Sequence, residues 1–382
     1  MNNMKSIYYK KFAGGVMKKL VIAFGLLFSF NVFAEYGLNM TEGVTSLSRD
    51  IYGLHMMVFW VSVVIAIVVF GAMLYSLYMH RQSKGAVAAN FHESTKAELI
   101  WTIVPMIILV GMAVPASKVL IDLEDTSKAQ MTVKITGHQW KWQYDYPEEG
   151  ISFISNLSQD SKDAVNGTDA DRENANHYLL DVDNRLVLPV DTSVRFLITS
   201  NDVIHNWWVP DFGVKQDANP GFINDAWAEI EEIGTYRGQC AELCGKDHGF
   251  MPIVVDVVSK EDYKKWVAKK QSEAAAAAVS ATKTWGKNEL MTKGKGVYNT
   301  NCAACHKADG SGMPPVFPAI KGSVIANGSA AAHLSIVLNG KGAMPQFKML
   351  GDSDLAAVIT YERNAFGNTG SVVQPSDIKS AR

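Results

Sequence analysis

The chain has 382 residues, enough for two or three domains, and a formal net charge of −2 at pH 7. A charge this close to zero gives no support to nucleic-acid binding or to a strongly charged partner. All four cysteines lie in two short motifs of the C-terminal half.

The first predicted element is a secretory signal peptide within residues 1–34. Lys18 and Lys19 form its basic start, an apolar run covers 20–30, and the sequence VFA at 32–34 is a small-residue cleavage site. An apolar run of about eleven residues is short for crossing a membrane. We therefore expect cleavage rather than a membrane anchor.

Two longer apolar segments follow the signal peptide. Residues 55–79 and 100–116 contain no Asp, Glu, Lys or Arg, and each segment is long enough to cross the hydrocarbon layer of a membrane. The short loop between them carries Arg81, Lys84 and Lys96, which predicts that this loop stays on the cytoplasmic side. The sequence therefore predicts a transmembrane hairpin with the rest of the chain on the outer face.

The remainder of the chain changes character three times. Residues 123–258 contain short β-rich runs separated by turn residues, which is typical of a β-sandwich or barrel; the polar stretch 156–176 within them is expected to be a surface insertion. Residues 259–285 favour helix, with alanine at every position of 274–278 and little apolar face, so we expect a semi-rigid tether. Residues 286–382 indicate a small all-α domain.

The first cysteine motif, CAELCGKDHGFM at 240–251, offers two thiolates, an imidazole and a thioether in one loop. This combination is typical of copper sites in electron transfer. Cys240 and Cys244 are four residues apart after a strand, so both sulfurs can lie on one side and bridge two metal ions. His205 is the candidate for a second imidazole. A disulfide would leave His248 and Met251 unexplained, and zinc, the other alternative, rarely takes a thioether.

The second cysteine motif, CAACH at 302–306, is a c-type haem attachment signal. Cys302 and Cys305 would form thioethers to the haem, and His306 would be the proximal iron ligand. A methionine as sixth ligand raises the haem potential. Met344 is favoured over Met313, because Met313 follows His306 too closely to reach the opposite face of the haem easily.

Three segments resemble subunit II of haem–copper cytochrome c oxidase: HQWKWQYDYP at 138–147, DVIHNW at 202–207 and the copper motif itself. The resemblance implies a binuclear CuA centre. Its ligands would be His205, Cys240, Cys244, His248, Met251 and the backbone carbonyl of Glu242. The resemblance also implies that the side chain of Glu242 reaches a magnesium or manganese ion at the boundary with subunit I, whereas the residue alone suggests a solvated carboxylate.

Two further residues gain a role from this resemblance. Trp140, the first tryptophan of the aromatic run, would be where electrons enter above CuA. Strand alternation would place Trp140, Trp142 and Tyr144 on one face, and ordinary sheet packing is the alternative explanation. Glu98, at the cytoplasmic end of the second apolar segment, would lie at the mouth of a proton pathway. Otherwise it is an acid outside the hydrocarbon.

The C-terminal part resembles class I cytochrome c, and the fusion resembles subunit II of caa-type oxidases. His333 is expected at a surface or packing position, not as a ligand. The expected fold is a multidomain membrane protein with a transmembrane helix hairpin, a cupredoxin-like β-barrel or sandwich and an all-α class I cytochrome c domain. Its predicted parts are 1–34, 35–122, 123–258, 259–285 and 286–382.

The predicted function is electron transfer in a terminal respiratory oxidase. Electrons would pass from a soluble or membrane-bound cytochrome c through haem c to CuA, and then to an oxygen-reducing partner. Expected partners are subunit I, subunit III and membrane lipid, with no nucleic acid, at the periplasmic face of a bacterial inner membrane. A nitrous oxide reductase-like module would not need the apolar pair and the aromatic run, and a copper-delivery protein would not need a covalent haem.

Overall fold

The computed structural model describes residues 39–382 except 89, 91, 166 and 343, so the expected signal peptide lies outside the described residues. The helices are α2 (Ser46–Met79), α3 (Thr95–Glu124), α4 (Gln159–Val165), α5 (Asp169–Asn174), α6 (Lys260–Thr282), α7 (Lys287–Asn301), α8 (Ala303–His306), α9 (Val324–Asn327), α10 (Ala330–Asn339), α11 (Asp352–Asn364) and α12 (Pro375–Ala381). The strands are β1 (Met131–His138), β2 (Lys141–Tyr146), β3 (Ile151–Ser155), β4 (Leu186–Pro189), β5 (Ser193–Ser200), β6 (His205–Val209), β7 (Val214–Ala218), β8 (Asn224–Glu229), β9 (Gly234–Cys240) and β10 (Pro252–Val258).

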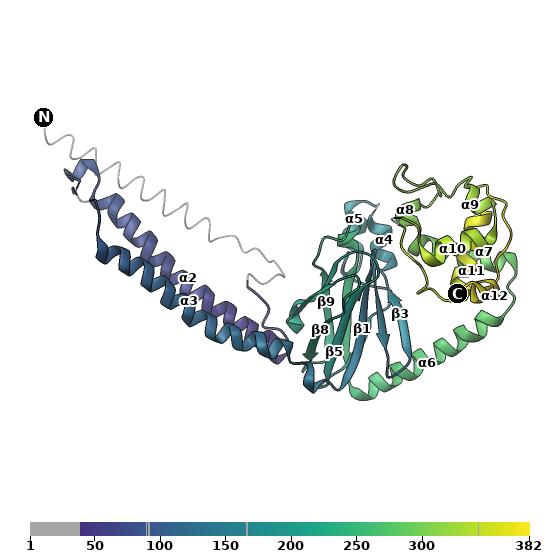
Figure 1. Ribbon diagram of the computed structural model, residues 1–382, viewed down its shortest axis with the longest axis horizontal. Coiled ribbons are helices and arrows are strands. Elements are labelled where there is room, and N and C mark those ends of the chain that lie inside the picture. The colour runs from purple at the N-terminus through teal and green to yellow at the C-terminus, as the bar shows by residue number, and fades with distance from the viewer. Residues whose placement is uncertain (1–38, 89, 91, 166, 343) are drawn as a thin grey trace. The chain divides into compact units, whose positions relative to one another are not determined.

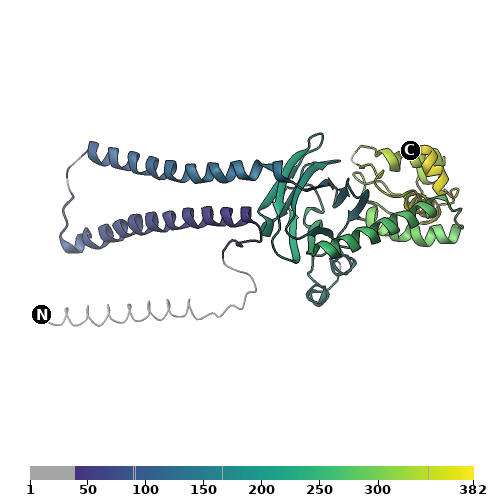
Figure 2. The same cartoon turned by 90° about the horizontal axis from the view of Figure 1, so that it is seen from below.

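Helices α2 and α3 form the expected apolar hairpin and run side by side (Figure 1 and Figure 2). Both are long and apolar enough to cross a membrane. Their large apolar side chains, such as Trp60, Phe70 and Trp101, are exposed, as lipid-facing side chains would be. Ser94 caps α3, and Glu98 lies in the first turn of that helix, where the positive end of the helix dipole favours an acid.

Two five-stranded sheets form the β-domain, in the orders β3-β2-β1-β5-β8 and β4-β10-β9-β6-β7. Alternation puts Trp142, Tyr144 and Tyr146 of β2 inward, and all three are fully buried. Strand β6 pairs with β9 in a register that sets Trp207 opposite Cys240. This pairing brings the start of β6, at His205, beside the end of β9. The cupredoxin-like sandwich is confirmed, and the polar stretch 156–176 contains the short helices α4 and α5.

Helix α6 differs from the tether that its alanine-rich sequence predicted. Tyr263, Trp266 and Val267 pack against the sandwich core. The ring centroid of Trp266 lies 5.1 Å from that of Tyr146 and 6.1 Å from that of Phe153. The expectation of little apolar face is wrong for the first turns of the helix. The i, i+3, i+4 spacing of the three residues makes one apolar face before the alanines begin.

The C-terminal helices form a separate apolar core that includes Leu290 and Tyr298 of α7 and Leu355 and Val358 of α11. Gly294 allows α7 and α11 to cross closely, because an added Cβ would lie only 2.1 Å from the Ala357 carbonyl oxygen. The all-α cytochrome c domain is confirmed.

His333 takes the packing position, one of the two alternatives expected for it. It does not lie at the surface, because only 5% of it is exposed. Its Nε2 lies 2.9 Å from Glu362 Oε2, and Glu362 is itself buried. The imidazole therefore joins α10 to α11, and a buried polar group of this kind needs such a partner.

Candidate metal centres

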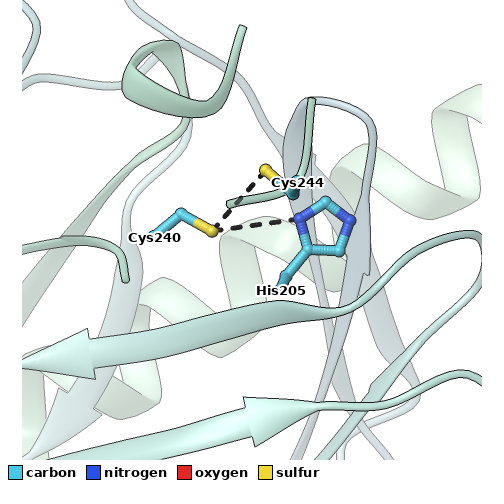
Figure 3. Close-up of side chains that lie close together, drawn as sticks. All are labelled: His205, Cys240 and Cys244. Atoms are coloured by element: carbon cyan, nitrogen blue, oxygen red, sulfur yellow. Dashed lines mark hydrogen bonds between the residues drawn. The ribbon is translucent and has the colours of Figure 1, made fainter. Parts of the chain in front are cut away.

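The copper-type residues come from two loops at one end of the sandwich. His205 begins β6, Cys240 ends β9, and Cys244 follows four residues later. Among the described residues, these three form the one group of potential ligands whose donor atoms all lie within 4.8 Å of one another. Figure 3 shows the two sulfurs and the imidazole facing a common space. All three residues are buried.

The donor atoms surround two sulfurs that are 3.8 Å apart and not bonded as a disulfide. Cys240 Sγ lies 3.9 Å from His205 Nδ1 and 3.4 Å from the Glu242 carbonyl oxygen. Cys244 Sγ lies 3.5 Å from His248 Nδ1 and 3.6 Å from Met251 Sδ. Each sulfur thus has one imidazole nitrogen and one weaker donor beside it. A set of this kind fits two copper ions that share two thiolates.

The two cysteines affect each other's protonation. A hydrogen bond between them lowers the pKa of Cys240 and raises the pKa of Cys244. Metal binding would require both as thiolates, since only thiolates are strong ligands.

Asp202 orients His205 within this group. Its Oδ1 accepts a hydrogen bond from His205 Nε2 at 2.9 Å, which turns Nδ1 toward the Cys240 sulfur. Burial alone would lower the pKa of His205, but the bonds to Asp202 and Cys240 outweigh it and raise the pKa. A carboxylate behind a metal-binding imidazole is a common support for such ligands.

Trp140 lies in the turn between β1 and β2, because β1 ends at His138 and β2 begins at Lys141. The expectation that Trp140 shares one strand face with Trp142 and Tyr144 is therefore wrong. Instead, the Trp140 indole Nε1 donates to the Cys244 carbonyl oxygen at 3.1 Å. This side chain thus contacts the copper loop directly.

The haem-attachment residues lie on a single helical turn. The amides of Cys305 and His306 both donate to the Cys302 carbonyl. His306 Nδ1 donates to the Pro318 carbonyl oxygen at 2.8 Å, so Nε2 is the ring nitrogen left to bind iron. Burial raises the pKa of Cys302 and Cys305. The residues fit a covalently attached haem.

The two candidate methionines have different surroundings. Met344 packs against the C-terminal core in the segment between α10 and α11. Met313 belongs to a short turn in which its backbone bonds in both directions with Phe317. Met344 stays the predicted sixth ligand.

The carboxylates of Glu98 and Glu242 lie outside these clusters. Glu242 is exposed, and its carbonyl rather than its carboxylate points to Cys240. Glu98 is exposed at the start of α3. Neither carboxylate belongs to a group of potential metal ligands within the described residues.

Two supporting residues were missed by sequence reasoning. Asp202 stands three residues before His205, and Gln139 stands beside Trp140, so both lie in segments already identified as important. Their roles depend on the distance between loops that are far apart in the chain, and no local pattern encodes that distance.

Comparisons with known families cover most of the chain in the same order as the structure. The family described as "Cytochrome C oxidase subunit II, transmembrane domain" matches residues 34–119, and "Cytochrome C oxidase subunit II, periplasmic domain" matches residues 131–258. The family described as "Cytochrome C oxidase, cbb3-type, subunit III" matches residues 289–361. These matches correspond to the helix hairpin, the sandwich and the C-terminal helices.

Individual relatives agree with the family matches. A probable cytochrome c oxidase subunit 2 of Rickettsia bellii is 39% identical over 265 residues, which cover 68% of this chain and 95% of the relative. Cytochrome c oxidase subunit 2 of Arabidopsis thaliana is 37% identical over 232 residues, with 60% and 88% covered. A crystal structure of the periplasmic domain of subunit II of cytochrome oxidase from Bradyrhizobium japonicum is 41% identical, with 38% of this chain and 96% of that chain covered and a TM-score of 0.34.

Proposed function

Because the chain belongs to the cytochrome c oxidase subunit II family, we propose that it is the electron-transfer subunit of a terminal respiratory oxidase. In this proposal, electrons from a donor pass through haem c to CuA and then to the partner subunit that reduces dioxygen. The family implies the CuA centre, and the C-terminal cytochrome domain implies haem c. The oxygen-reducing site belongs to the partner.

The observation that carries the proposal is the arrangement of three side chains and one backbone carbonyl around two unbridged cysteines. His205, His248 and Met251 surround the sulfurs of Cys240 and Cys244, and the Glu242 carbonyl completes the set. Two copper ions sharing these thiolates would supply one-electron chemistry with little rearrangement. The protein would contribute a fixed donor set within a buried site.

A second set of residues would hold the haem. Cys302 and Cys305 would carry the thioethers, and His306 would bind the iron through Nε2. The hydrogen bond from His306 Nδ1 to the Pro318 carbonyl supports this tautomer. Met344 would be the sixth ligand, since its position between α10 and α11 packs it against the domain core.

Three further residues would have roles in electron entry, metal binding and proton transfer. Trp140 would be the place where electrons reach the copper loop, supported by its bond to the Cys244 carbonyl. The Glu242 carboxylate would bind magnesium or manganese at the boundary with subunit I, and its exposure leaves it free to do so. Glu98 would lie at the mouth of a proton pathway.

The membrane hairpin and the family matches define the setting of the chain. Two apolar helices anchor the chain, and the sandwich is a periplasmic family domain. We place the complex in a bacterial inner membrane, with subunits I and III as partners and a soluble or membrane-bound cytochrome c as the donor.

The test replaces one cysteine of each motif in the intact complex. Cys240→Ser should remove the near-infrared copper band and abolish oxygen uptake with reduced cytochrome c, while the c-type haem band stays. Cys302→Ser is the matched control: it should disturb the haem band and leave the copper band in place. Full oxygen uptake by Cys240→Ser would show that the chain is not the electron relay.

A further inference from the structure

The turn between β1 and β2 bonds to both loops that carry the copper-type residues. Gln139 Nε2 and Trp140 Nε1 both donate to the Cys244 carbonyl oxygen, at 3.0 and 3.1 Å. The Gln139 backbone N–H donates to Asp202 Oδ2 at 2.7 Å. Gln139 therefore contacts one loop through its side chain and the other through its backbone.

Asp202 continues this connection to a ligand side chain. Its Oδ1 accepts hydrogen bonds from His205 Nε2 at 2.9 Å and from the Val203 N–H at 2.7 Å. Only about a tenth of the Asp202 side chain is exposed, so water competes little for these bonds. The carboxylate therefore links the Gln139 backbone to the His205 ring.

Two glycines make room for this arrangement. Gly245 has φ of +116°, and an added Cβ would lie 3.1 Å from both Gln139 Nε2 and Trp140 Cζ2. At Gly137, an added Cβ would lie 2.8 Å from His205 Cδ2. A side chain at Gly137 would clash with the His205 ring, and one at Gly245 would crowd the turn and strain the backbone at its positive φ.

We propose that Gln139 and Asp202 are positioning residues for electron transfer into the copper centre. Gln139 holds the Cys244 carbonyl in the place where the Trp140 indole N–H bonds it, and Asp202 fixes the tautomer and orientation of His205. This proposal rests on the proposed function. The two residues have separable effects: Gln139 affects the rate of electron transfer through Trp140, and Asp202 affects the position of the ligand His205.

The test of Gln139 uses the intact, copper-loaded complex. Gln139→Leu removes the side-chain donor but keeps the backbone N–H that bonds Asp202. We expect electron transfer from haem to copper after flash reduction to slow about tenfold, because Trp140 loses its fixed position. The copper EPR and near-infrared spectra should not change. Gln159→Leu, on α4, is the matched control and should transfer electrons at the wild-type rate.

Asp202→Asn should behave differently. It should change the copper EPR hyperfine pattern and weaken copper binding by roughly 10- to 100-fold, since His205 loses its carboxylate partner. Asp202→Glu, which keeps the charge, should restore part of the binding. A third measurement needs no copper: in the copper-free chain, hydrogen exchange at 241–250 should be faster in Gln139→Leu than in Gln159→Leu.

The outcomes separate this inference from the proposed function. If the wild-type chain does not pass electrons from haem to copper, the proposed function fails. If the wild type does so and Gln139→Leu matches its rate and its hydrogen exchange, the positioning role of Gln139 is wrong. Wild-type copper spectra and affinity in Asp202→Asn would contradict the role of Asp202.

Discussion

His138 is a buried titratable residue beside the copper-type cluster. It is 3% exposed at the end of β1, and its Nε2 donates to Gln143 Oε1 at 3.3 Å. Burial, helped by the charge of Lys141, lowers its pKa from 6.5 to about 4. The unfolded chain therefore binds more protons than the folded chain between these values, so the free energy of unfolding rises with pH across this window.

The difference between the folded and unfolded pKa of His138 predicts that this residue makes the protein less stable in acid. The contribution of His138 to the free energy of unfolding is fully present above pH 6.5. About 3 kcal/mol of it is lost as the pH falls to about 4. The free energy of unfolding should fall between pH 7 and pH 4 by about 3 kcal/mol more in the wild type than in His138→Gln. Denaturant unfolding followed by tryptophan fluorescence measures it at each pH. His177→Gln, at an exposed position, is the control and should follow the wild type. Identical pH profiles for wild type and His138→Gln would contradict this origin.

At the level of elements, the sequence predicted the apolar helices, the strand-rich domain and both cysteine motifs, because each follows a local period or spacing. It did not predict the turn at Trp140 or the docking of α6. The composition of α6 is dominated by alanine and lysine, which indicates an exposed helix. The apolar face made by Tyr263, Trp266 and Val267 is confined to its first turns and was therefore not predicted. Which face of a helix finds a partner depends on the surface opposite, here the rings of Tyr146 and Phe153.

The docking of α6 predicts a local loss of stability when Trp266 is removed. Trp266 is partly buried among aromatic rings, so Trp266→Ala should destabilise this packing by about 2 kcal/mol. Hydrogen exchange in β2 and β3 should then be roughly 30-fold faster in the solubilised chain. Lys269→Ala, on the exposed side of α6, should change exchange little. Equal exchange in the two variants would mean that α6 does not stabilise the sandwich.

At the level of the whole molecule, a cytochrome c oxidase subunit II domain and a cytochrome c domain share one polypeptide. Helix α6 has 23 residues, which corresponds to about 34 Å of helix. A covalent connection keeps each domain near the other, whatever the protein concentration. Neither domain needs a strongly charged docking surface for this purpose.

The connection predicts how electron transfer between the two domains responds to conditions. After flash reduction, the rate of copper reduction by the chain's own haem should not depend on protein concentration. It should also change little with added salt, because no charged encounter limits it. The comparison is the double variant Cys302→Ser/Cys305→Ser, supplied with a soluble cytochrome c. There the rate should rise with cytochrome concentration. A concentration-dependent rate in the wild type would show that electrons pass between molecules, and the covalent connection would then have no role in the relay.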